Sequence, residues 1–399
     1  MKRALLAVAV AGLLAAAALP ARAQGEFPLK YTDAQAGDPI LTMGGRMVQP
    51  AKEKPADLKA VPKEVSGQVK YFAIPFGDKQ VLAVADDSKP PKLYVDTAGT
   101  GDLSAAAPVT RSGPEGVGQY GPVALTVGGP QGQTAVKVRF HVLDDARLLF
   151  VMPAGYMAGE VTLAGQAYRV AVVSNSSDAR YDKAIQFPLS RSAPPEVNMF
   201  AIDLNQDGRF DTNVQMSGEV MPLAKMVRVK DVYYSLQVAP DGSSVRVAKI
   251  DPGMGTLDAG GPDVEMMVLS DAGFQRFSGS DGKWQAPAGH YMTVQAQLSK
   301  TDAAGAKWTL TGSGAGKLEN FEVRKGETLS LKLGPPLVTK IEADPAGDGL
   351  VSISLALEGR GGERYGPGAA KANSPLGPPE FKILDGDGKV LTSGKFAFG

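Results

Sequence analysis

Residues 160–173, "EVTLAGQAYRVAVV", decide the fold class of this chain. Their last part, "YRVAV" (168–172), alternates in the manner of a strand that buries one face and leaves the other in water. The same period of two residues returns in "VKVRF" (136–140). A helix would need a period of about 3.6 residues, so both stretches predict β-strands.

Short runs of the same kind, bounded by Gly, Asp and Pro, extend on both sides of this stretch from about residue 67 onward. The chain holds 48 Gly and 29 Pro, which favour many turns between short strands. Helical periodicity is nearly absent, and "LAKMVRV" (223–229) is the best candidate for a helix. We therefore predict an all-β protein with two to three β-sandwich-like domains after a flexible N-terminal segment.

Shifts in composition indicate the domain boundaries. Residues 24–66 are rich in Pro, Ala and Lys, and we expect them to form an extended lead-in or linker. A β domain is expected at 67–240, followed by β-sandwich-like domains at 241–334 and 335–399. "GPPL" at 334–337 is the predicted hinge, because proline removes ladder donors and stiffens the chain.

Residues 1–23 have the pattern of a secretory signal. Lys2 and Arg3 precede an apolar stretch, and Ala21-Arg22-Ala23 offers a cleavage site of small residues. A membrane anchor is the alternative, but the apolar run at 4–19 is short for a span. We expect cleavage after Ala23, a secreted or periplasmic protein, and no membrane span in the mature chain.

Charge and cysteine content limit the possible partners and the possible sources of stability. Loss of the leader would leave 39 basic and 42 acidic residues, a balance that disfavours nucleic acid as a partner. The chain contains no Cys, so disulfides cannot hold it. Stability then has to come from buried cores, and a bound metal would add to it.

The sequence "DLNQDGRFD" (203–211) places oxygen-bearing side chains at alternate positions around a glycine. This spacing suits calcium, because oxygens at positions 1, 3, 5 and 9 and the carbonyl of position 7 can converge on one cation. Gly208 at position 6 supplies the backbone freedom for the sharp turn. The alternative is an unoccupied hairpin turn, because Asp-Gly pairs are common turn residues. The predicted calcium ligands are the side chains of Asp203, Asn205, Asp207 and Asp211 and the carbonyl of Arg209.

The loop departs from an EF-hand at position 12, where Val214 stands in place of a bidentate Glu. It resembles the D-x-[DN]-x-[DN]-G-x-x-D calcium loop of integrin-type β-propeller blades, and it is similar to the first half of a dockerin loop. With "YVDTAGTGDLS" (94–104) and the C-terminal stretch "GGERYGPGAAKANSPLGPPEFKILDGDGKVLTSGKFAFG" (361–399), the chain resembles uncharacterised exported bacterial β-rich proteins that carry such loops. The resemblance implies a multi-domain secreted or periplasmic protein and no known catalytic residues.

Partial copies of the loop occur at 96–104, "DTAGTGDLS", at 174–182, "SNSSDARYD", and at 344–352, "DPAGDGLVS". The first two follow strand-like runs, as the full loop does, so we interpret them as one hairpin device that keeps all its ligands only at 203–211. The unequal spacing lacks the period of a propeller blade, which disfavours that fold. "DGDG" (385–388) is expected to be a turn only.

No catalytic arrangement stands out. His141 and His290 belong to no zinc pattern, and cysteine nucleophiles and a G-x-S-x-G elbow are absent from the sequence. Two distant carboxylates could still serve a secreted hydrolase, so the enzyme question stays open with a lean toward none. Trp284 and Trp308 with Tyr291 leave a carbohydrate-binding module as another alternative, although strand aromatics are more often core residues.

The expected function is therefore that of an exported, non-enzymatic calcium-binding β-protein. Its role would be structural, or binding, at the cell envelope or outside the cell. The expected partner is an envelope or extracellular protein or a polysaccharide.

Overall fold

The computed structural model describes residues 24–34, 38, 45–65, 68–77, 79–86, 88, 91–112, 118–143, 148–190, 196–212, 218–261, 263–314, 318–347, 350–372 and 374–396. The described residues form strands in several mainly antiparallel sheets and no α-helix, which confirms the all-β prediction. Within these ranges, no helix is long and apolar enough to cross a membrane. The predicted leader at 1–23 lies outside the described residues.

Residues 160–173 belong to a hairpin formed by β10 (Gly155–Leu163) and β11 (Gln166–Val173). Its two-residue turn consists of Ala164 and Gly165, both with positive φ. Such a turn matches the right-handed twist of the paired strands. The alternation at 168–172 therefore gives β11 two defined faces.

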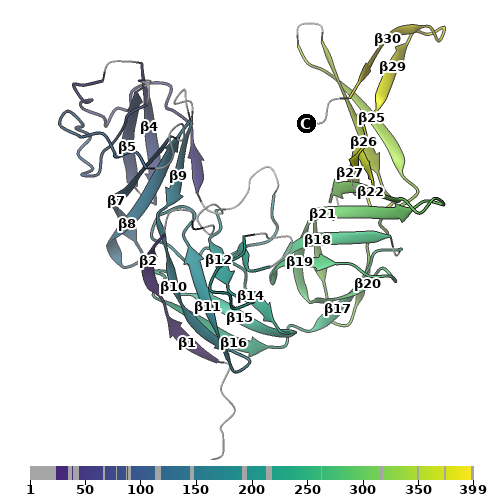
Figure 1. Ribbon diagram of the computed structural model, residues 1–399, viewed down its shortest axis with the longest axis horizontal. Coiled ribbons are helices and arrows are strands. Elements are labelled where there is room, and N and C mark those ends of the chain that lie inside the picture. Colours follow the sequence, from purple (N-terminus) through teal and green to yellow (C-terminus); the bar gives the residue numbers. More distant parts are fainter. Residues whose placement is uncertain are drawn as a thin grey trace, which may run out of the picture.

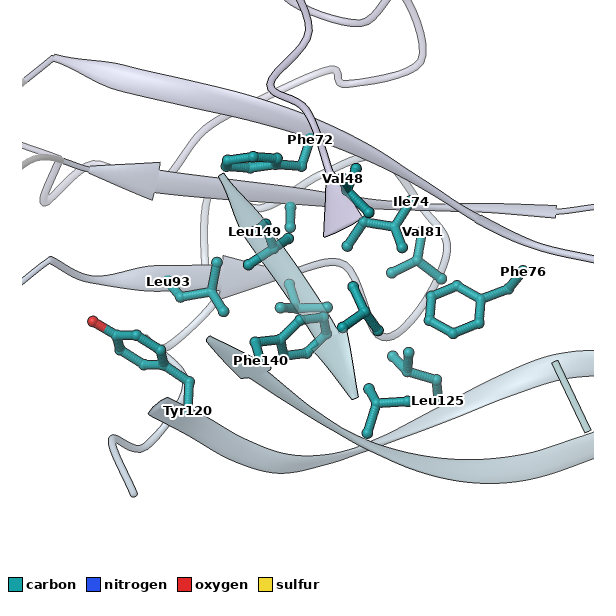
Figure 2. Close-up of a cluster of buried hydrophobic side chains, with 14 of the residues drawn as sticks. Val48, Phe72, Ile74, Phe76, Val81, Leu93, Tyr120, Leu125, Phe140 and Leu149 are labelled. Atoms are coloured by element: carbon teal, nitrogen blue, oxygen red, sulfur yellow. The ribbon is translucent and has the colours of Figure 1, made fainter. Parts of the chain in front are cut away.

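Two sheets pack face to face in the first unit, with the core between them (Figure 2). The first sheet has the order β3-β9-β8-β7, and the second has the order β4-β5-β6. Their strands are β3 (Arg46–Val48), β4 (Val69–Phe76), β5 (Lys79–Asp86), β6 (Leu93–Val95), β7 (Gln119–Gly129), β8 (Gly132–Val142) and β9 (Leu149–Pro153).

The second unit is also sandwich-like, with sheet orders β1-β16-β15-β14 and β13-β12-β11-β10-β2. Alternate residues of β11 and β12 face two different clusters, so both faces of the five-stranded sheet are buried. The remaining strands are β1 (Gln24–Pro28), β2 (Lys30–Asp33), β12 (Met199–Ile202), β13 (Val220–Pro222), β14 (Met226–Val229), β15 (Val232–Val238) and β16 (Ser244–Ile250).

A third unit surrounds the core of Trp284, Tyr291 and their neighbours. One sheet has the order β20-β17-β24, and a larger sheet runs β19-β18-β21-β22-β27-β26-β25, with β23 on β21 and β28 on β27. Its strands are β17 (Met254–Asp258), β18 (Val264–Ser270), β19 (Gly273–Phe277), β20 (Lys283–Pro287), β21 (Gly289–Thr301), β22 (Lys307–Ser313), β23 (Asn320–Val323) and β24 (Thr328–Ser330).

The C-terminal strands extend that larger sheet and add a separate hairpin of β29 and β30. The units follow one another along an arc, with the first unit at one end and these strands at the other (Figure 1). Their bounds are β25 (Val338–Pro345), β26 (Val351–Glu358), β27 (Arg364–Lys371), β28 (Ser374–Pro375), β29 (Glu380–Leu384) and β30 (Val390–Lys395).

The structure corrects the predicted lead-in at 24–66. Its described residues supply strands β1, β2 and β3, and Leu58 is buried. These strands pair with β16, β10 and β9, which lie far along the chain. Composition could not reveal this pairing, because it depends on partners distant in sequence.

Two predicted boundaries also shift. The boundary at 240/241 falls between β15 and β16, which are paired from Tyr233↔Ile250 to Val238↔Val245. The segment 335–399 is joined to the preceding unit, because β22 pairs with β27 in one sheet. The best helix candidate, 223–229, is not helical: residues 226–229 form β14, with Val227 and Val229 buried on either side of exposed Arg228.

Candidate functional site

Three loops of nine residues share one backbone pattern: 96–104 after β6, 174–182 after β11 and 203–211 after β12. We call them the nonapeptide loops. In each of them positions 4 and 6 have positive φ, which non-glycine residues rarely adopt. Position 4 is Gly99, Ser177 or Gln206, with φ of 67°, 53° and 62°, and position 6 is Gly101, Ala179 or Gly208, with φ of 73°, 59° and 81°.

The three loops also share their buried positions and one hydrogen bond. Position 1 is buried as Asp96, Ser174 or Asp203, and position 8 is buried as Leu103, Tyr181 or Phe210. The N–H of position 7 donates to the side-chain oxygen of position 5, from Asp102 to Thr100, from Arg180 to Asp178 and from Arg209 to Asp207. The predicted repetition is therefore present in the backbone. The loops at 174–182 and 203–211 begin longer connections between paired strands, from β11 to β12 and from β12 to β13. β6 is not paired with β7, the next strand along the chain, so the predicted hairpin setting does not apply to 96–104.

In the loop at 203–211, side-chain oxygens accept hydrogen bonds from backbone N–H groups of the same loop. Asp203 Oδ2 accepts the N–H of Gly208 at 3.0 Å, and Asn205 Oδ1 accepts that of Asp207 at 2.9 Å. Asp207 Oδ1 accepts the N–H of Arg209 at 2.8 Å. Each of the two aspartates thereby retains a second carboxylate oxygen that these backbone bonds do not use.

The second oxygen of Asp203 lies in a buried environment, as does Oδ2 of Asp86. Asp203 is 4% exposed, and its Oδ1 is buried without a hydrogen-bond partner among the described residues. Burial of an ionised oxygen without a partner is costly, because water no longer solvates it. A cation at this oxygen would remove that cost.

Glu219 is a buried carboxylate that the sequence analysis missed. It is 1% exposed, and its Oε1 accepts the N–H groups of Leu204 and Asn205 at 3.0 and 3.1 Å. Its Oε2 accepts the N–H of Asp211 at 2.8 Å. Glu219 therefore holds the beginning and the end of the loop together. The EF-hand comparison concerned Val214, which lies outside the described residues.

Packing behind the loop fixes its orientation. Phe210 is buried in the cluster on the outer face of β11 and β12. The guanidinium of Arg169 on β11 lies 5.1 Å from the centre of the Phe210 ring, and its Nη1 donates to the carbonyl of Gly208 at 2.6 Å. The loop is therefore anchored on the five-stranded sheet, with positions 3 to 7 exposed to solvent.

The remaining predicted ligands are exposed, and the structure brings only some of them together. Asn205 Nδ2 lies 3.3 Å from Asp207 Oδ2, and Arg209 and Asp211 are exposed on the same loop. Among the described residues, no three His, Asp or Glu side chains form a ready metal cage. Calcium at this loop would thus draw on the amide of Asn205 and on main-chain oxygen as well as carboxylates.

The loop at 174–182 contains an ammonium group from its own chain. Lys183 Nζ lies 2.6 Å from Asp178 Oδ2 and 2.8 Å from Ser176 Oγ, and it reaches Glu196 at 3.3 Å. Burial acts to raise the pKa of Asp178, but hydrogen bonds from Lys183, from Ser176 and from the N–H of Arg180, together with the charge of Lys183, hold the pKa below its ordinary value. Lysine thus occupies the position that an external cation would need.

In the loop at 96–104, backbone N–H groups of the loop donate hydrogen bonds to both carboxylate oxygens of Asp96. Asp96 Oδ1 accepts the N–H of Thr100 at 3.1 Å, and Oδ2 accepts that of Gly101 at 2.6 Å. Neither oxygen is left without a partner. Ser174 Oγ, at position 1 of the loop at 174–182, donates to Asp178 Oδ1. Among the described residues of the nonapeptide loops, only Asp203 thus keeps a buried oxygen at position 1 without a hydrogen-bond partner.

The fourth candidate copy differs from these loops. Asp344 and Ser352 are directly paired across the β25–β26 hairpin, whereas positions 348 and 349 lie outside the described residues. "DGDG" joins β29 to β30, and Asp385 Oδ1 accepts the N–H groups of Asp387 and Lys389. That stretch is a hairpin turn, as predicted.

The residues considered for other functions occupy structural positions. Trp284 stacks on Phe277 in the third core and Tyr291 is 1% exposed, while Trp308 donates to Asp302 at 2.8 Å. These aromatics do not form one exposed platform. His290 is 53% exposed at its side chain, and its Nδ1 lies 3.1 Å from Asp271 Oδ2.

His141 lies on β8, with its ring 5.9 Å from that of Phe150. Its neighbours Asp144 and Asp145 lie outside the described residues. Comparison with known proteins adds no assignment: no family model, no curated protein and no solved structure matches this chain.

Proposed function

We propose that this chain is an exported, non-enzymatic calcium-binding β-protein in which a cation at 203–211 stiffens the second unit. The observation that carries the proposal is the buried Oδ1 of Asp203, which has no hydrogen-bond partner among the described residues. Calcium prefers oxygen ligands in loops of this spacing, and it would neutralise that carboxylate. The expected ligands remain Asp203, Asn205, Asp207 and Asp211 with the carbonyl of Arg209.

The position of the loop gives the cation a structural role. The loop begins the connection between β12 and β13, two paired strands of the five-stranded sheet. Binding to the folded chain but not to the unfolded chain raises stability by mass action. A chain without cysteine has no disulfide to supply the same restraint.

The location and partners follow from the sequence alone. The pattern of residues 1–23 supports export to the periplasm or the exterior, where calcium is available to weak sites. We place the protein at the cell envelope or outside the cell. There its partner would be an extracellular protein or a polysaccharide.

A matched pair of variants tests calcium binding. Asp203→Asn keeps an oxygen for the N–H of Gly208 but removes the charge, and Asp96→Asn makes the same change at a position of equal burial. We expect calcium to raise the melting temperature of the parent and of Asp96→Asn, measured against EDTA, and to leave Asp203→Asn unchanged. Equal melting temperatures of the parent with and without calcium would refute the proposal.

A further inference from the structure

The last part of the larger sheet ends in an exposed two-stranded hairpin, which we call the C-terminal arm (β25 and β26). All eight residues of β25 are exposed, and in the described chain β25 pairs only with β26. It is therefore a free edge, whose unpaired backbone groups can accept another strand. The arm stands away from the first two units in the arrangement of the chain (Figure 1).

One face of the C-terminal arm is mainly apolar, with Thr339 as its polar member. In the observed register Ile341 lies opposite Leu355, and Ala343 lies opposite Ile353. Part of this face, on β26, lines a hollow together with Phe381 and Phe396 of the last segment. Ile341 on β25 remains 64% exposed. Among the described residues, none after Leu333 belongs to a buried apolar cluster.

The charges of β25 are complementary to those of a second β25. An antiparallel pair related by a twofold axis through Ile341 places each Lys340 opposite the Glu342 of the other copy. The same register places Thr339 opposite Ala343 and joins the apolar faces of the two arms. Opposite charges directly across an antiparallel pair are favourable, and like charges are unfavourable.

Neighbouring registers lack this match. Centring the axis on Lys340 would set two lysines face to face, and centring it on Glu342 would set two glutamates face to face. A shift by one residue in the pairing would also mix the apolar and polar faces. The sequence "VTKIEAD" therefore favours the register centred on Ile341 over its neighbours.

We propose that β25 is an interface for a second copy of this chain, which adds its own β25 to form one continuous sheet across the twofold axis. The interface is isologous, because the same strand contributes from both copies. Lys340 and Glu342 protect the edge against strands of other charge pattern. In this arrangement they select the second copy.

Sedimentation equilibrium in EDTA over a range of protein concentrations tests the association independently of calcium. We expect a monomer–dimer equilibrium for the parent. Ile341→Lys puts two ammonium groups on the axis and should weaken the dimer by about tenfold or more. Leu350→Lys is the matched control, because Leu350 is 66% exposed in the connection between β25 and β26, away from the axis, and this variant should dimerise like the parent.

The absence of cysteine from the sequence permits a direct test of the register. Ile341→Cys brings two thiols opposite each other, within the Cα separation of about 4.4–6.8 Å that a disulfide needs. Oxidation should convert this variant into a covalent dimer much faster than Leu350→Cys. Circular dichroism of each variant checks that the fold persists.

Three outcomes would overturn the proposal. The first is a monomer at every concentration, and the second is an equal dimer from Ile341→Lys. The third is equal crosslinking of the two cysteine variants, which would indicate random encounter. None of these results depends on whether 203–211 binds calcium.

Discussion

Lys183 Nζ lies 2.6 Å from Asp178 Oδ2, the side chain at position 5 of the loop at 174–182. The related loop at 203–211 has Asp207 at the same position, and within the described part of the chain no lysine pairs with it. One backbone conformation thus occurs with an internal cation in one copy and with an unsatisfied carboxylate oxygen in another. The comparison separates what the loop backbone does from what its side chains bind.

Removal of the internal ammonium should destabilise the protein. Lys183→Met leaves Asp178, whose side chain is 7% exposed, without its charged partner, and we expect a loss of about 1–3 kcal/mol in the free energy of unfolding. Urea denaturation measures this loss. Lys137→Met is the control, because the Lys137–Asp33 pair is exposed and should contribute less than about 1 kcal/mol. Equal losses for the two variants would contradict the assigned role of Lys183.

The lowered pKa of Asp178 predicts that this residue's contribution to the free energy of unfolding depends on pH in the acid range. A carboxylate whose pKa is lower in the folded state stabilises the fold above its unfolded pKa, ordinarily 3.8, and loses this effect as pH falls through the folded value. The stability difference between the parent and Asp178→Asn should therefore be greatest near neutral pH and shrink in the acid range. A stability difference that grows on acidification would show that folding does not lower the pKa of Asp178.

The side chain of Arg209 should be dispensable for calcium. Only its carbonyl is a predicted ligand and the side chain is exposed, so Arg209→Ala should bind calcium as tightly as the parent or slightly more tightly. Asp207→Ala should lose most of the affinity. Isothermal titration calorimetry compares the two variants, and a large loss in Arg209→Ala would mean that the ligand geometry is different.

Glu219 should be needed for the shape of the loop rather than for the charge of the cation. Glu219→Gln replaces an acceptor of three backbone N–H bonds with an amide that has one acceptor oxygen. We expect a loss of about 1–3 kcal/mol in the free energy of unfolding even in EDTA. If the variant is as stable as the parent in EDTA, these hydrogen bonds do not contribute to the stability of the fold.

The backbone of position 6 gives a prediction that does not involve ligands. Gly208 has a φ of 81°, and an added Cβ would meet no atom within 4 Å, so Gly208→Ala tests conformation alone. We expect a cost of about 1–2 kcal/mol. Gly386→Ala is the control, since its Cβ also meets open space and its backbone lacks the positive φ. Equal stabilities of the two variants would contradict the conformational argument.

The sequence predicted the strands wherever their pattern is local. The period of two in β8 and β11 follows from one buried and one exposed face, and no distant partner is needed to detect it. At 223–229, Leu223, Met226 and Val227 also fit a helical spacing. There the competing period of two in residues 226–229 belongs to the actual strand, β14.

The candidate site was only partly predictable for the same reason. The spacing of 203–211 is local, whereas Glu219 lies beyond the loop and no spacing rule links it to the backbone groups that it binds. Lys183 follows the degenerate loop directly, and a basic residue next to lost ligands was a usable signal. The strands in 24–33 gave none, because proline and weak periodicity conceal them.

The pairing of β1 with β16 delays the folding of the second unit during synthesis, because the two strands lie far apart in the sequence. Glu26 on β1 accepts a hydrogen bond from Arg246 on β16, 220 residues later. A ribosome adds about 5–20 residues per second, so roughly 10–45 s separate the appearance of these partners. Throughout that interval β1 has no edge to join, and the second unit cannot close. A chaperone that binds nascent chains would find residues 24–28 exposed longest, at the very start of the predicted mature protein.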